Sequence, residues 1–195
     1  MIILYGLGNN EDKYLNTKHN IGRRILEEVA GKVASSFGKN KTYYYTKSEL
    51  TGDSIYFLYS SGYMNESGRA LVDFCRYTNI DPDTKLLIIH DDSDQIEGSI
   101  KLLPKGGSAG HHGINSIYRE LLATQLTIDN IWRLKVGIRP PENTLKSETF
   151  VLKSLSKTDQ MTIQKTSDQL TGALPILATN QWEEVQKTMN TKKPD

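Results

Sequence analysis

The sequence predicts a single α/β domain with a mixed, mostly parallel twisted sheet flanked by helices. Short apolar segments typical of strands alternate along the chain with segments whose apolar side chains recur at helical spacing. The 195 residues, 37% of them hydrophobic, suit one core of ordinary size. No internal repeat, low-complexity segment or linker divides them. We therefore expect one domain over residues 1–190, followed by a frayed tail at 191–195.

The N-terminal half contains three expected strands and two expected helices. Residues 1–8 are a short apolar run that ends in glycines, as a buried strand often does. Residues 20–38 repeat apolar side chains at helical spacing and close on a glycine, which predicts a helix. Residues 42–50 and 54–60 flank Thr-Gly-Asp and are rich in aromatic and β-branched side chains, which predicts a hairpin. Residues 67–79 are amphipathic at helical spacing and predict the second helix.

The C-terminal half continues the alternation of strands and helices. Strand patterns occur at residues 85–92, 99–104 and 132–139. The first ends in two acidic residues, the second ends in a proline, and the third is followed by two prolines. Helical periodicity occurs at residues 113–123, 156–178 and 181–190. Ser156 opens the long helix, and Pro175 should kink or end it because proline lacks a backbone N–H.

Composition indicates a soluble globular protein without disulfides. The mean hydropathy is −0.49, and no apolar run is long enough to span a bilayer. The first residues lack the basic region and cleavage site of a signal peptide. The single cysteine, Cys75, excludes an internal disulfide and lies at helical spacing from apolar neighbours, which indicates core packing. We therefore expect a cytoplasmic protein with no membrane association.

The charge is nearly balanced overall but not locally. The net charge of +1 does not by itself indicate a nucleic-acid binder. Between Ser99 and Arg139, however, six basic residues stand against two acidic ones: Lys101, Lys105, Arg119, Arg133, Lys135 and Arg139 against Glu120 and Asp129. A local basic surface is what phosphate contact requires, although a solvated face explains the same charges.

The segment GLGNNE follows the first strand and invites comparison with a dinucleotide-binding loop. The comparison fails because Glu11 stands where that motif needs its third glycine. Gly6 and Gly8 are better explained as a sharp turn that leaves Asn9 exposed.

His19, in the stretch DKYLNTKHNIG, has three interpretations: an ordinary loop residue, a metal ligand or a general base. No second histidine follows at ligand spacing, and a base needs an orienting carboxylate. Asp91 is the candidate, because side chains alternate along the strand 85–92 and His90 should point the other way. Asp92, Asp94 and Glu97 are explained equally well as loop acids.

The segment KGGSAGHHGINSI is rich in glycine and opens a helix. Exposed amide groups at such a helix start bind anions, but a tight strand-to-helix connection also needs glycines. His111 and His112 are adjacent, so we do not expect both to face one site, and the pair is a poor metal motif.

Together these segments resemble the bacterial-type peptidyl-tRNA hydrolase family. The resemblance rests on GLGN with Tyr14, TKHNIG, YMNESG, HDDSD, KGGSAGHHG, RLKVGI and FVLKSL, in the family's order and spacing over almost the whole chain. It implies a monomeric cytosolic esterase that uses no metal or cofactor. Its substrate would be peptidyl-tRNA, cleaved at the ester between the peptide and the 3′ ribose. The cleavage would recycle tRNA from prematurely released peptidyl-tRNA.

The resemblance also implies roles for individual residues. His19 would activate water, Asp91 would hold its imidazole, and Asn9 would separate N-blocked peptidyl substrates from free aminoacyl ones. Asn20 would lie beside His19. Contacts to the substrate end would come from Tyr14, Tyr63, Met64, Asn65, His111 and His112, and contacts to tRNA from Lys105 and Lys135.

The chain departs from the family pattern in three places. The usual GNPG is GNNE, and the usual GHNG places His112 where the family has a substrate-binding asparagine. Leu103 stands at a position that is often basic, so phosphate contact is expected to shift to Lys101 or Lys105. These changes affect the expected affinity and selectivity more than the reaction type.

Two other functions are compatible with these residues. An RNA-binding module that kept the fold and lost catalysis, as plant splicing-factor relatives did, is motivated by His112. A metallohydrolase would use His19 with Asp91 or Asp94.

Overall fold

The computed structural model describes residues 1–141 and 149–190, so the expected frayed tail at 191–195 lies outside the described residues. The described chain forms one seven-stranded sheet in the order β2-β3-β4-β1-β5-β7-β6. The strands are β1 (Ile2–Gly6), β2 (Gly38–Lys39), β3 (Tyr43–Leu50), β4 (Asp53–Ser60), β5 (Lys85–Ile96), β6 (Ile100–Pro104) and β7 (Ile131–Arg139). The helices are α1 (Ile21–Val33), α2 (Ser67–Thr78), α3 (His112–Glu120), α4 (Lys157–Ala178) and α5 (Trp182–Met189).

The sheet is mixed, as the sequence predicted. Among the described strands, the central pairs β4–β1, β1–β5 and β5–β7 are parallel, and the outer pairs β2–β3, β3–β4 and β6–β7 are antiparallel. The short connection between β3 and β4 is the predicted hairpin. Because β1, β5 and β7 run in one direction, the loops that follow them meet at one edge of the sheet.

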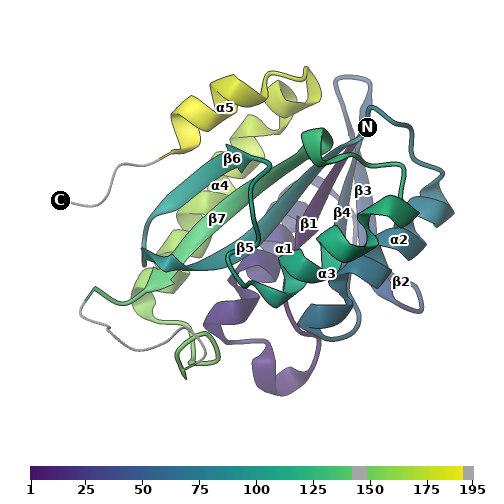
Figure 1. Ribbon diagram of the computed structural model, residues 1–195. Coiled ribbons are helices and arrows are strands. Elements are labelled where there is room, and N and C mark those ends of the chain that lie inside the picture. The colour runs from purple at the N-terminus through teal and green to yellow at the C-terminus, as the bar shows by residue number, and fades with distance from the viewer. Residues whose placement is uncertain (142–148, 191–195) are drawn as a thin grey trace.

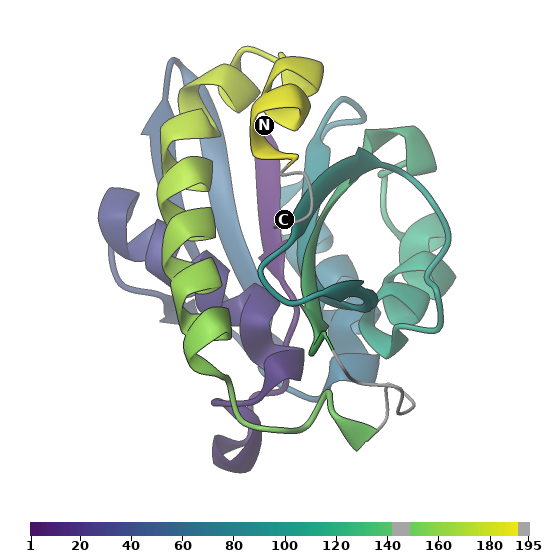
Figure 2. The same cartoon turned by 90° about the vertical axis from the view of Figure 1, so that its left-hand side faces the viewer.

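Helices cover both faces of the sheet (Figure 1). One apolar cluster joins the sheet to α1, α4 and α5, and a second joins it to α2 and α3. Figure 2 shows α4 running along the face that also carries α1, with α5 at its C-terminal end. Trp182 of α5 stacks on Trp132 of β7, with ring centroids 5.4 Å apart.

The alternation of β5 decides which way its polar end points. Leu87 and Ile89 pack on the α1 side, whereas Leu86 and Ile88 pack on the α2 and α3 side. Asp91 continues the first series and therefore faces the segment that leads into α1.

Two boundaries and the expected effect of one proline differ from the prediction. Helix α1 ends at Val33, and Gly38 instead begins β2, where it pairs with Tyr45 at the sheet edge. Strand β5 continues to Ile96, past its acidic residues, because β7 pairs with it there. Helix α4 continues past Pro175 to Ala178, because the proline lies in the last turn and its carbonyl still accepts the N–H of Thr179.

Candidate active site

A cavity of about 390 Å³ lies where the loops after the parallel strands meet. His19 reaches it from a single 3-10 turn, η2 (Lys18–Asn20), which leads directly into α1. The remaining walls come from residues 90–93 of β5, residues 108–112 before and at the start of α3, Lys135 of β7, Val151 and Leu152. The cavity thus joins segments that are far apart in the sequence.

His19 and Asp91 form the central pair, as the sequence predicted. His19 Nδ1 lies 2.9 Å from each carboxylate oxygen of Asp91, and both residues are buried. Burial by itself lowers the pKa of His19, but the charge and hydrogen bond of Asp91 outweigh it and raise that pKa above its ordinary value. Because Nδ1–H donates to the carboxylate, Nε2 is the ring atom that can take a proton.

His111 is a second imidazole on the same carboxylate. Its Nε2 lies 2.9 Å from Asp91 Oδ1, and its ring centroid lies 4.9 Å from that of His19. Its Nδ1 accepts the N–H groups of Gly113 and Ile114, at 3.1 and 3.4 Å, and so caps α3. An Nδ1 that accepts requires the proton on Nε2, which His111 therefore donates to Asp91.

The two imidazoles keep Asp91 ionised. Burial works against the charged carboxylate, but His19 and His111 hold the pKa of Asp91 far below its ordinary value. The His90 ring packs edge-on against that of His111, with ring centroids 5.0 Å apart, and its Nδ1 lies 2.7 Å from the carbonyl oxygen of Asp91. Burial lowers the pKa of His90 to about 3, so this ring stays neutral.

The expectation that His111 and His112 would not face one site is wrong. Both line the cavity. His111 has extended backbone as the N-cap of α3, whereas His112 is the first helical residue. The change of backbone direction at the cap brings both side chains to the same side.

Asn9 is buried rather than exposed, which corrects a second expectation. Asn20 Oδ1 accepts the N–H of Asn9, and Asn20 Nδ2 donates to the carbonyl of Asn9, both at 2.8 Å. Asn9 Oδ1 accepts the N–H of Met64 at 2.8 Å. These bonds fix the loop after β1 and leave the Nδ2 group of Asn9 as a donor.

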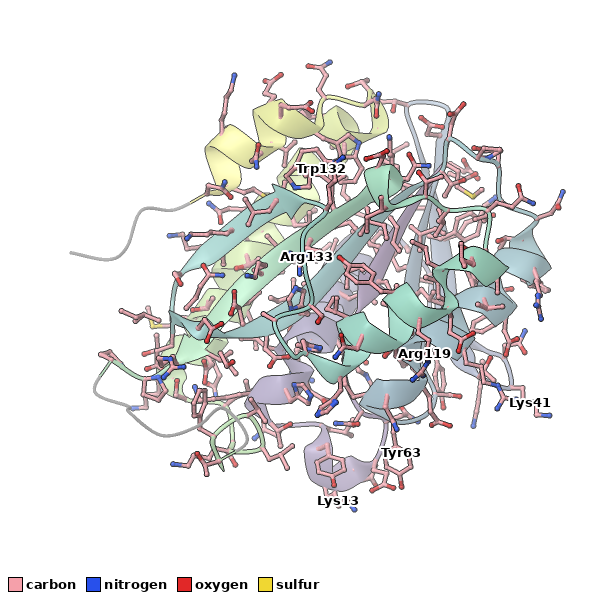
Figure 3. All side chains as sticks on the ribbon, in the orientation of Figure 1. Lys13, Lys41, Tyr63, Arg119, Trp132 and Arg133 are labelled. Atoms are coloured by element: carbon pink, nitrogen blue, oxygen red, sulfur yellow. The ribbon has the colours of Figure 1, made fainter. Side chains whose placement is uncertain are left out.

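Five expected contact residues lie outside the cavity lining: Tyr14, Tyr63, Met64, Asn65 and Lys105. The Tyr63 hydroxyl donates to the Glu11 carboxylate, and Figure 3 places Tyr63 and Lys13 at the same edge of the molecule. Lys105 is exposed and paired with Asp129. The N–H of Lys105 donates to the carbonyl of Ile131, the first residue of β7, whereas the cavity is lined by Lys135 farther along that strand.

Met64 differs from the other four in its burial. It is buried and packs against Gly113 at the start of α3. Its backbone N–H also holds Asn9, so Met64 links the loop after β1 to the cavity wall.

Lys135 lies in the cavity wall but is already paired. Its Nζ is 2.6 Å from Asp92 Oδ2, and the Lys135 side chain is 19% exposed. The neighbouring Arg133 (Figure 3) is buried and donates to the carbonyls of Lys105 and Gly107, which supports the loop before α3. The basic stretch noted in the sequence therefore contains both structural and accessible charges.

His19, Asp91 and His111 also form a group whose donor atoms all lie within 4.8 Å of one another. A histidine that binds a metal normally donates its other ring N–H to an acceptor. His111 Nδ1 instead faces two N–H groups, so its Nε2 carries a proton and is poorly suited to a metal. Asp94 does not join the group, because its side chain is 71% exposed beside Arg139.

The resemblance includes FVLKSL at residues 150–155, but the sequence did not predict that this segment borders His19. Val151 O accepts the N–H of His19 at 2.8 Å, and Lys153 O accepts the N–H of Lys18 at 2.9 Å. No local pattern could reveal a pairing between segments so distant in the chain.

No helix in the described residues is long and apolar enough to cross a membrane.

Comparison with known proteins gives a consistent result. A sequence profile of the family described as Peptidyl-tRNA hydrolase matches residues 3–195. A peptidyl-tRNA hydrolase from Rickettsia bellii (strain OSU 85-389) is 32% identical over 191 residues, which are 97% of this chain and 100% of the relative. One from Rickettsia peacockii is 32% identical over 186 residues, which are 94% of this chain and 98% of the relative. A crystal structure of peptidyl-tRNA hydrolase from Acinetobacter baumannii matches with a TM-score of 0.84 and 26% identity, covering 100% of this chain and 97% of the other.

Proposed function

The chain belongs to the peptidyl-tRNA hydrolase family, whose members hydrolyse the ester bond of peptidyl-tRNA, and we propose that His19 is its general base. The observation that carries the proposal is the His19–Asp91 pair, with both Nδ1–O distances at 2.9 Å. This bond orients Nε2 and stabilises the imidazolium that forms when water is deprotonated. General base assistance of this kind is typically worth ~10²–10⁴-fold in rate.

The proposed reaction needs one proton to move twice. His19 Nε2 takes a proton from water while the water oxygen attacks the ester carbonyl. The tetrahedral intermediate then collapses, the bond to the 3′ oxygen of the ribose breaks, and that oxygen takes the proton from His19. Asp91 stays ionised throughout, because two imidazoles donate to it. The products are tRNA with a free 3′ hydroxyl and a peptide carboxylic acid, which then loses the second proton of the water to solvent.

Asn9 is proposed to distinguish a substrate whose α-nitrogen is acylated from one whose α-amine is free. Its Oδ1 is occupied by Met64 N–H, so the side chain presents only N–H donors. Such a donor can bind the peptide carbonyl of a peptidyl substrate. It repels the ammonium group of a free aminoacyl substrate, which also carries only donors.

Basic side chains at the β6–β7 edge are proposed to contact tRNA phosphate. Lys101 lies opposite Lys135 in the strand register, and Lys105 follows at the end of β6. Lys135 must exchange Asp92 for phosphate, whereas the exposed Lys105–Asp129 pair is expected to open at little cost.

We also propose that the protein is a cytoplasmic monomer, as the resemblance implies. Sedimentation equilibrium tests whether it is a monomer.

The test is hydrolysis of an N-acetyl-aminoacyl-tRNA, with the unblocked aminoacyl-tRNA as comparison. Wild type should cleave only the blocked ester, and His19→Ala should lose nearly all cleavage while still binding tRNA. Near-normal cleavage by His19→Ala contradicts the mechanism. Binding without cleavage by wild type supports the RNA-binding alternative, and loss of cleavage after prolonged chelation supports the metallohydrolase.

A further inference from the structure

A buried ion cluster lies next to His19 and has no part in the proposed chemistry. Lys18 Nζ is 2.5 Å from Asp159 Oδ2 and 3.0 Å from Glu97 Oε2. The Lys18 side chain is 4% exposed, that of Asp159 is 0% exposed and that of Glu97 is 16% exposed. An ammonium group this deeply buried is tolerated only when it is paired, and these two carboxylates supply the pairing.

The three members come from three different parts of the fold. Lys18 belongs to η2, and Asp159 is the third residue of α4, where its Oδ2 also accepts the N–H of Ser156 at 2.7 Å. Glu97 directly follows β5, the strand that carries Asp91. The cluster therefore fastens η2 both to the start of α4 and to the end of β5.

The turn that presents His19 has little structure of its own. It is a three-residue 3-10 turn without a side-chain cap. Its backbone is held by the segment before α4, through bonds to Lys153 O and Val151 O. That segment in turn enters α4 through Leu155 and Ser156, next to Asp159. Residues 151–153 border η2, and α4 begins shortly after them. Through Asp159, Lys18 therefore ties η2 to the start of that helix.

We propose that Lys18 is a positioning residue for the base: its ammonium group, held between Asp159 and Glu97, sets the place of η2 so that His19 Nδ1 meets Asp91. This inference rests on the proposed role of His19. A displacement of a catalytic group by about 1 Å can cost on the order of 10²-fold in rate. The cluster acts on the chemical step and leaves the expected substrate contacts in place.

The experiment compares Lys18→Met, Lys18→Arg and Lys32→Met with wild type. Lys32 is a matched control because its Nζ also binds α4, through Ser167 at 3.0 Å and Asp168 at 2.8 Å, but far along the helix from η2. Lys18→Met should lower kcat by ~10²-fold and change KM by less than about twofold. Lys18→Arg should restore most of kcat, and Lys32→Met should keep the wild-type value.

A second readout does not depend on turnover. The proton on His19 Nδ1, shared with Asp91, should give a downfield NMR signal in wild type, in Lys18→Arg and in Lys32→Met. The signal should shift or disappear in Lys18→Met. If Lys18→Met does not fold, Glu97→Gln replaces it, and a partial loss of kcat with a shifted signal is expected.

Two results overturn the inference: a folded Lys18→Met, or Glu97→Gln in its place, with wild-type kcat and signal, or an equal loss of kcat in Lys32→Met. Failure of the proposed function looks different. In that case wild type itself does not hydrolyse the blocked ester, and the His19 signal still reports whether Lys18 positions the ring.

Discussion

His111 donates its Nε2 proton to Asp91 Oδ1 over 2.9 Å, so the carboxylate that orients the base serves two imidazoles. Its tautomer is fixed from the other side, because Nδ1 accepts two N–H groups at the start of α3. The cap of α3 therefore influences how far the charge of Asp91 raises the pKa of His19.

Replacing His111 by alanine should raise the pKa of His19. Asp91 would then direct its charge at one imidazole only, which favours the protonated form of His19. The acid limb of the kcat/KM profile, which reports the free enzyme, should move to higher pH. A limb that stays in place or moves to lower pH contradicts shared control by the two imidazoles.

Replacing Asp91 by asparagine should lower kcat by ~10²–10⁴-fold. The new amide can donate to His19 Nδ1, which turns the proton toward Nε2 and removes the lone pair that activates water. Single-turnover hydrolysis of the blocked substrate measures the loss. Circular dichroism should show an intact fold, and a kcat within tenfold of wild type would disagree with the mechanism.

The same pair predicts how stability depends on pH. The depressed pKa of Asp91 contributes stability that is present above its ordinary pKa of 3.8 and is lost as the pH falls through the folded value. The raised pKa of His19 contributes stability that is present below its ordinary pKa of 6.5 and is lost as the pH rises through the folded value. Urea unfolding of wild type should show both losses, and Asp91→Asn should weaken both.

Asp92→Asn should strengthen tRNA binding. It releases the ammonium group of Lys135, which Asp92 holds at 2.6 Å, for contact with phosphate. KM for the blocked substrate should fall, and the salt dependence of binding should steepen by about one phosphate contact. Asp129→Asn is the control, since it releases the exposed Lys105, whose pair with Asp129 is worth little. Weaker binding by Asp92→Asn would show that Asp92 positions Lys135 for phosphate.

Two glycines of α1 should respond in opposite ways to alanine. A Cβ on Gly22 would lie 2.1 Å from the carbonyl oxygen of Ile89, so Gly22→Ala should lower the free energy of unfolding by ~1–3 kcal/mol. A Cβ on Gly31 would meet no atom within 4 Å, so Gly31→Ala should raise it by ~0.5–1 kcal/mol. Urea denaturation measures both. A neutral Gly22→Ala would mean that α1 can move away from β5.

Local patterns predicted much of this fold because most elements carry their own signal. The alternation of Leu87 and Ile89 correctly directed Asp91 toward His19. The end of α1 was missed because Gly38 is used by a sheet edge, which depends on Tyr45 in another strand. The effect of Pro175 was overestimated: the helix loses the bond of one N–H there, but it continues to Ala178 and the Pro175 carbonyl still accepts the N–H of Thr179.

The site was predictable where one strand or one loop determined the geometry. The shared cavity position of His111 and His112 depends on a cap conformation that adjacent sequence letters do not reveal. The burial of Asn9 depends on Asn20, across a turn whose path the sequence does not give. The pairing of Lys18 and His19 with residues 151–153 depends on chain topology alone.

The clasp between Asn20 and Asn9 has a consequence for how this site can diversify. The Asn20 side chain bonds to the main-chain N–H and carbonyl of Asn9. These two bonds therefore do not depend on the side chain at position 9. Aspartate at position 20 could not donate, and glutamine would be too long, so position 20 tolerates little change. A selection for altered substrates should therefore recover variants at position 9 and none at position 20. The main-chain bonds to Asn20 hold the loop whatever residue stands at position 9, and a substitution there removes only the bond from Met64 N–H.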